Sequence, residues 1–160
     1  MSATHNFSAA DIMAANIQGI QRGLALAMGE LQTNMRIRLS QKGGGVGYIG
    51  GRKGKGSFRT RSSPGQPPAK DTGTLRNSVQ IQPRKVNGTG FISIVMAGLV
   101  AGEHKDARIP GWLERGTSRM KARPFIAPSL KEIRPTVADT ISKQMELAIK
   151  RMQTRAMRST

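Results

Sequence analysis

The sequence predicts an α+β fold in which one small antiparallel sheet packs with a long N-terminal helix and a long C-terminal helix. Apolar residues recur every three or four positions over residues 13–39 and again over 130–152, which is the spacing of one helix face. Between these stretches, an Asn-Gly pair at 87–88 separates two strand-like segments, which is a hairpin signal. Residues 1–160 are therefore expected to form a single domain, which carries a flexible basic arm.

The first helix is expected to begin after Ser8 and to end at the glycines that start at Gly43. Ser8 is a suitable N-cap, and Asp11 places a carboxylate near the positive end of the helix. The predicted buried face consists of Met13, Ile17, Ile20, Leu24, Ala27, Leu31, Met35 and Leu39. Such a helix is about 50 Å long, which is long for a small globule, so part of it is expected to pack on another subunit.

Residues 42–70 are predicted to form the flexible basic arm, which ends in a proline-rich connector. Residues 41–70 contain nine glycines and seven Lys or Arg residues without an acid, so they bury too little apolar surface to offset the entropy of ordering. The candidate contacts with DNA or a partner are Lys42, Arg52, Lys53, Lys55, Arg59 and Arg61. Two short apolar clusters, 46–49 and 57–58, are expected to pair as a hairpin when the arm docks.

The middle of the chain is expected to supply the sheet, and the last part a helix. Residues 79–82 alternate between apolar and polar, and the run over 91–97 is apolar enough for a central strand. A turn after this strand is expected to place Trp112 in the core. The final helix is predicted to start at Pro128, whose missing N–H suits a first turn, and either to kink at Pro135 or to begin there.

Composition and motif spacing exclude several classes of protein. The chain has a formal net charge of +17, two histidines and no cysteine, so thiolate metal sites and disulfide-stapled modules are excluded. A GxGxxG motif at 45–50 follows a helix instead of a strand, so it does not indicate a dinucleotide site. No catalytic residue, metal, cofactor, membrane span or signal peptide is expected. The charge favours a polyanionic partner, with a solvated surface as the alternative reading.

Two motifs stand out when they are taken together. A Pro-Gly-x-Pro-Pro connector leads into a Thr-Gly-x-Leu-x-x-Ser turn, and a Glu-x-Gly-Thr-Ser-x-x-x-Ala-Arg-Pro-Phe block precedes the final helix. The matching residues are Pro64, Gly65, Pro67, Pro68, Thr72, Gly73, Leu75, Ser78, Glu114, Gly116, Thr117, Ser118, Ala122, Arg123, Pro124 and Phe125, with Trp112 just before the block. Over residues 63–150 the chain thereby resembles the tail completion family of long-tailed bacteriophages, also described as the tail-component or head–tail joining family. Lys121 departs from the family, which often has proline there.

The resemblance implies a structural virion protein at the head–tail junction, or neck, and not an enzyme. It implies a ring of subunits, expected to be a hexamer, that completes the tail and joins it to the DNA-filled head. The implied partners are the tail terminator or tail tube protein on one side and head connector proteins on the other, with double-stranded DNA in the channel and no membrane. The expected locations are the virion and, during assembly, the host cytoplasm. A sequence-independent basic nucleic-acid-binding protein is the alternative.

Residues of the second block favour structural roles. Gly116 is expected to supply a backbone angle that a side chain forbids, and Pro124 to fix an extended entry to the final helix. Phe125 is expected to supply aromatic area to the core. Glu114 and Arg123 either pair across this turn or face solvent separately.

Overall fold

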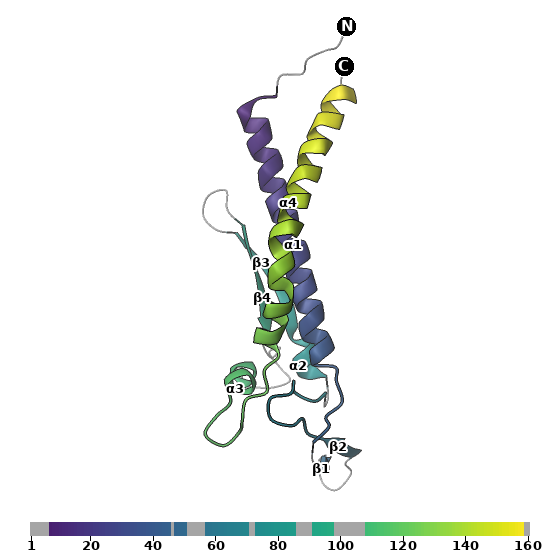
Figure 1. Ribbon diagram of the computed structural model, residues 1–160, viewed down its shortest axis with the longest axis vertical. Helices are drawn as coiled ribbons and strands as arrows, with labels where there is room; N and C mark the ends of the chain where they lie inside the picture. Colours follow the sequence, from purple (N-terminus) through teal and green to yellow (C-terminus); the bar gives the residue numbers. More distant parts are fainter. Residues whose placement is uncertain are drawn as a thin grey trace.

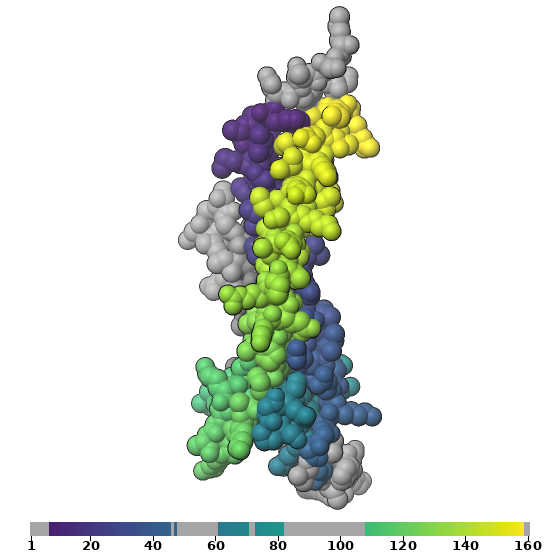
Figure 2. All heavy atoms as spheres, viewed as in Figure 1, coloured from purple at the N-terminus to yellow at the C-terminus, as the bar shows by residue number. Residues whose placement is uncertain are grey.

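The computed structural model describes residues 7–45, 47–50, 57–70, 73–85, 91–97 and 108–158. Two long helices dominate it: α1 (Ala9–Arg38) and α4 (Ile126–Arg158) lie side by side and run in opposite directions (Figure 1). The start of α1 and the end of α4 lie at one end of this pair, while α2 (Thr74–Asn77) and α3 (Ile109–Arg115) lie toward the other. Figure 2 shows the same elongated shape, with α4 running along one face. The predicted packing of a long N-terminal helix with a long C-terminal helix is therefore confirmed.

Helix α1 begins where the sequence predicts, at a reciprocal cap between Ser8 and Asp11. The Asp11 amide donates to the Ser8 hydroxyl at 3.2 Å, and the Ser8 amide donates to Asp11 Oδ2 at 3.2 Å. Hydrogen bonds from the side chain and then the backbone of Ser8 lower the pKa of Asp11. Because these hydrogen bonds lower the pKa of Asp11 in the folded state, the cap contributes fully to the free energy of unfolding above the ordinary pKa of aspartate. This contribution is lost as the pH falls through the lowered pKa of Asp11.

Small residues form the face of α1 that packs against the last part of α4. The buried positions recur every four residues and are Ala15, Gly19, Gly23 and Ala27. A Cβ atom at Gly19 would lie 2.4 Å from Met145 Cα, so the two backbones touch here. Long side chains do not fit between helices this close, and they turn outward. The predicted apolar face is therefore wrong at Met13 and Ile20, which are 64% and 38% exposed.

The hydrophobic core lies in the other half of the helix pair. Its buried members come from both long helices and from residues beside them: Leu31, Met35, Leu39, Val79, Phe125 and Ile133. Leu75 of α2 and Leu113 of α3 pack against this cluster. The predicted buried face of α1 is therefore confirmed over residues 27–39. Large apolar side chains pack on the core in this part of the helix, in place of the small residues that form its contact near Gly19.

The sheet is smaller than predicted among the described residues. Strand β3 (Val79–Lys85) pairs antiparallel with β4 (Phe91–Ala97), with Val79 opposite Ala97, and this pair lies beside α1 (Figure 1). The apolar β4 is not a central strand in the described part, because β3 is the strand it pairs with there.

A second antiparallel pair lies within the predicted arm. Strand β1 (Gly47–Gly50) pairs with β2 (Ser57–Thr60), with Ile49 opposite Phe58. The amide of Gly45 donates to the Arg61 carbonyl at 2.8 Å and closes the base of this pair. The hairpin expected on docking is therefore formed within the single chain, whereas the flexibility of the arm stays a prediction.

Helix α4 starts at Ile126, slightly before the predicted start at Pro128, and continues through Pro135 to Arg158. The prediction that the element begins at Pro135 is therefore wrong. Pro135 is exposed, and Ile133 and Val137 on either side of it pack on the core. This packing holds both sides of the helix in place despite the missing backbone N–H.

Candidate functional site

The two segments that carry the family resemblance meet in the fold. The Gly65 amide in the connector donates to the Ala122 carbonyl in the block at 2.9 Å. Gly65 has a φ of 82°, a left-handed conformation that favours glycine, and Pro68 is buried nearby in the connector. We call the unit formed by residues 63–68 and 112–125 the motif junction. It lies at the end of the helix pair where α4 starts.

Glu114 of α3 caps α4 and is the centre of the motif junction. Its carboxylate accepts hydrogen bonds from the amides of Phe125 at 2.9 Å, Ile126 at 2.9 Å and Ala127 at 2.8 Å. The first amides of a helix have no partner within the helix, and the next residue, Pro128, has no N–H to satisfy. One side chain therefore satisfies every unpaired amide of the first turn, and its negative charge lies at the positive end of the helix dipole.

Arg123 does not pair with Glu114, and neither of the two alternatives predicted for this pair is found. The backbone amide of Arg123 donates to the Leu113 carbonyl at 2.7 Å, and its Nη1 lies 3.7 Å from Met120 Sδ. Its Nε is buried and has no hydrogen-bond partner within the described part of the chain. Arg123 thus helps to hold the block against α3 instead of neutralising the cap.

Gly116 has the backbone conformation that the sequence predicts only glycine can supply. Its φ is 80° and its ψ is −179°, a region that is essentially restricted to glycine. A Cβ atom here would lie 2.8 Å from the Met120 carbonyl oxygen and 2.9 Å from the Ala122 amide nitrogen. Gly116 therefore lets the chain turn from α3 into a tight loop, which Thr117 and Met120 close with paired backbone hydrogen bonds.

We expect Gly116→Ala to lower the free energy of unfolding by about 3 kcal/mol, because it combines a forbidden backbone angle with backbone clashes. Chemical denaturation followed by circular dichroism measures the change. Gly111→Ala is the matched control, because the Cβ atom would meet only the flexible end of the Arg115 side chain. Equal stability of the two variants would contradict the assigned role of Gly116.

The aromatic residues of the block differ from each other in burial. Phe125 is fully buried in the core, as predicted. Trp112 is 38% exposed, and the Arg108 guanidinium lies 5.1 Å from the centre of its ring, so the prediction of a core tryptophan is wrong. The buried side of α3 carries Pro110 and Leu113, and Trp112 lies off that face because of the helical spacing.

The remaining matched residues shape the chain around the motif junction. Gly73 is the N-cap of α2 with a φ of 85°, and the buried Ser78 donates from its hydroxyl to the Leu75 carbonyl at 2.7 Å. Pro67, Ala122 and Pro124 are half-buried, and Pro64, Thr117 and Ser118 are exposed. Thr72 lies outside the described residues. Within the described part of the chain, these residues do not bring together reactive side chains of the kind that form a catalytic site.

The predicted basic contacts are only partly covered by the structure. Lys42 and Arg61 are exposed at the base of the β1–β2 pair. Arg59 lies in β2. Arg52, Lys53 and Lys55 lie outside the described residues. Their contacts with DNA or a partner therefore stay a prediction.

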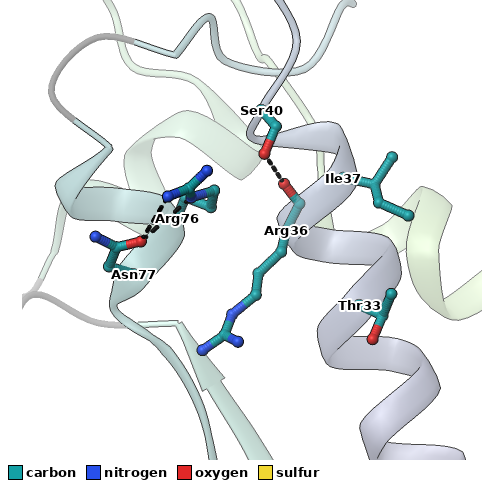
Figure 3. A pocket seen from close by; sticks show the side chains of 6 residues that line it. All are labelled: Thr33, Arg36, Ile37, Ser40, Arg76 and Asn77. Carbon is teal, nitrogen blue, oxygen red and sulfur yellow. Dashed lines mark hydrogen bonds between the residues drawn. The ribbon is translucent and has the colours of Figure 1, made fainter.

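A basic hollow lies between α1 and α2, and the sequence did not indicate it. It has a volume of about 640 Å³ and is lined by Thr33, Arg36, Ile37, Ser40, Arg76 and Asn77 (Figure 3). Arg36 Nη2 donates to the Val79 carbonyl at 2.8 Å, and Arg76 donates to Asn77 Oδ1 at 3.2 and 3.1 Å. Neutral acceptors therefore hold both guanidinium groups, and none of the lining residues is acidic. The hollow has the chemistry to bind a phosphate or carboxylate.

The described residues contain no group of three or more potential metal ligands, and none of their helices is long and apolar enough to cross a membrane. Comparison of the chain with family models, curated proteins and solved structures gave no match.

Proposed function

We propose that this chain is a structural virion protein at the head–tail junction of a tailed bacteriophage, where it completes the tail and joins it to the DNA-filled head. The motif junction carries the proposal together with the resemblance. Glu114 caps a helix, Gly116 turns the chain and Phe125 fills the core. These matched residues serve one structural unit and none of them carries a reactive group into a site, which suits a protein whose function is to hold neighbours in place.

A ring of subunits, expected to be a hexamer, suits the surface of the helix pair. Large apolar side chains are exposed along both long helices: Ile12, Met13, Ile20, Leu26, Ile37, Leu130, Leu147 and Met157. Exposed apolar surface of this kind favours contact with other copies, and head-to-tail contacts between copies close into a ring when the rotation permits. The tail terminator or tail tube protein and the head connector proteins are the proposed neighbours, with DNA in the channel.

Deletion of the gene from the phage that encodes this chain tests the proposal. Electron microscopy of the lysate should show filled heads and unjoined tails, and joined particles should return when the gene is supplied in trans. In a map of the intact neck, residues 8–40 should contact a neighbouring copy. Normal numbers of joined, infectious particles without the gene would reject the role.

A sequence-independent nucleic-acid-binding protein is the second candidate function. The basic hollow of Arg36 and Arg76 and the net charge of +17 favour it. The same deletion separates the two candidates, because loss of a separate DNA-binding protein leaves heads and tails joined.

A further inference from the structure

Three arginines from two helices gather on the seam between α1 and α4. Arg22, Arg151 and Arg155, which we call the arginine cluster, line two adjacent hollows of about 170 and 640 Å³. The helices touch at Gly19 and Gly23 and diverge toward the start of α1 and the end of α4 (Figure 1). This divergence leaves space beside the seam, and small residues such as Ala15 and Ala148 form part of its floor.

The arginine cluster has no acidic partner in the described part of the chain. The ion pair among the described residues joins Arg38 and Glu132, and neither of these residues lines a hollow. No carboxylate lines either hollow. Arg151 and Arg155 lie four residues apart on one helix, where like charges destabilise the helix. Arg22 adds a third positive charge from the opposite helix. The three positive charges repel one another in the free chain, and a bound polyanion would relieve this repulsion.

We propose that the arginine cluster binds backbone phosphates of double-stranded DNA; this inference rests on the proposed position of the ring around the DNA. Guanidinium groups form paired, charge-assisted hydrogen bonds with phosphate oxygens. Among the described residues, no aromatic side chain lines either hollow. Single-stranded nucleic acid is bound mainly by stacking of bases on aromatic rings, so the chemistry of the seam fits a duplex backbone. Binding is independent of base sequence because phosphates carry no sequence information.

Binding of the purified full-length chain to a fluorescent DNA duplex tests the site. The probe is a short duplex of mixed sequence, and anisotropy gives the affinity at several salt concentrations. Each phosphate contact contributes about 0.9 to the slope of log affinity against log salt, so replacing all three arginines by glutamine should lower that slope by about 2.7. Between about 50 and 200 mM salt, the wild type should therefore lose about 40-fold more affinity than the triple variant.

A charge-matched variant distinguishes the site from general charge. Lys121, Lys131 and Arg134 are exposed and lie outside both hollows, and their replacement by glutamine removes the same charge. This control should keep nearly the full salt slope. The triple variant of the arginine cluster should melt close to the wild-type temperature, because the repulsion that is removed and the lost attraction of Arg155 to the C-terminal end of α4 are both small and oppose each other. Equal slopes for the two variants, or wild-type affinity in the cluster variant, would overturn the proposal.

A competition experiment separates DNA from an acidic protein as the occupant. Duplexes of unrelated sequence should displace the probe equally well, and polyglutamate of equal charge should displace it poorly. Displacement by polyglutamate as strong as by duplex would overturn the assignment to DNA. Because these measurements use the isolated chain, they can fail while the gene deletion still shows a joining role, and a failed deletion test leaves the binding result unchanged.

Discussion

Replacement of Glu114 by alanine should lower the free energy of unfolding by about 2–4 kcal/mol, because the first amides of α4 lose their common acceptor. Three amides donate to this carboxylate, and the lost charge also lies beside the helix dipole. For a chain of this size, the melting temperature should fall by about 5–15 °C. Glu114→Gln keeps one acceptor oxygen and should have roughly half the effect. Chemical and thermal denaturation of the purified variants measure both changes.

Glu132→Ala is the matched control for this prediction. Glu132 is also a glutamate near the start of α4, and its carboxylate pairs with Arg38 at 2.9 Å on the surface. An exposed ion pair of this kind contributes at most about 1 kcal/mol. If Glu114→Ala proved no more destabilising than Glu132→Ala, the capping role of Glu114 would be wrong.

Gly19→Ala should destabilise the protein by about 3 kcal/mol although alanine is the better helix former. The new Cβ atom would lie 2.4 Å from Met145 Cα and 2.8 Å from the Met145 amide nitrogen. Both atoms belong to the backbone, so the helices must separate to accommodate the methyl group. The cost of this strained packing exceeds the roughly 1 kcal/mol that alanine gains over glycine in a helix. Equilibrium unfolding in urea gives the change directly.

Gly29→Ala on the same helix should have the opposite effect on stability. No atom lies within 4 Å of a Cβ atom at Gly29, so the variant should be about 1 kcal/mol more stable than the wild type. A stabilised Gly19→Ala variant would show that α1 and α4 do not touch at this point. The sign of the change, and not only its size, therefore decides between close and loose packing.

The sequence predicts the start of α1 better than its end, which lies at Arg38 and not at Gly43, and better than the face by which α1 packs. Ser8 and Asp11 form the predicted cap because a cap depends on neighbouring residues. The buried face from Ala27 to Leu39 follows the apolar pattern for the same local reason. The pattern failed near Gly19 because the prediction assumed that large apolar residues mark the contact, whereas the helices meet through small residues. That choice depends on the distance to the partner helix, which is a property of the tertiary structure.

The candidate site was likewise predictable only in part. The role of Gly116 was predictable, since a glycine between a helix end and a tight loop often has positive φ. The cap by Glu114 was not predictable, because the carboxylate lies on α3 and the amides that donate to it lie at the start of α4. The two groups meet only through the turn that connects these helices. The arginine cluster was hidden for a similar reason. Arg22 is separated from Arg151 by most of the chain, and only the antiparallel packing of α1 and α4 brings them to one seam.

The carboxylate of Glu114 joins α3 to the first turn of α4, so the position of α3 and the start of α4 are coupled. The 33 residues of α4 extend for about 50 Å. Helix α4 also packs on the core through Ile133 and touches α1 where Gly19 meets Met145. A tilt of α3 on contact with a neighbour therefore acts on both long helices at once, and through them on the seam that carries Arg22, Arg151 and Arg155.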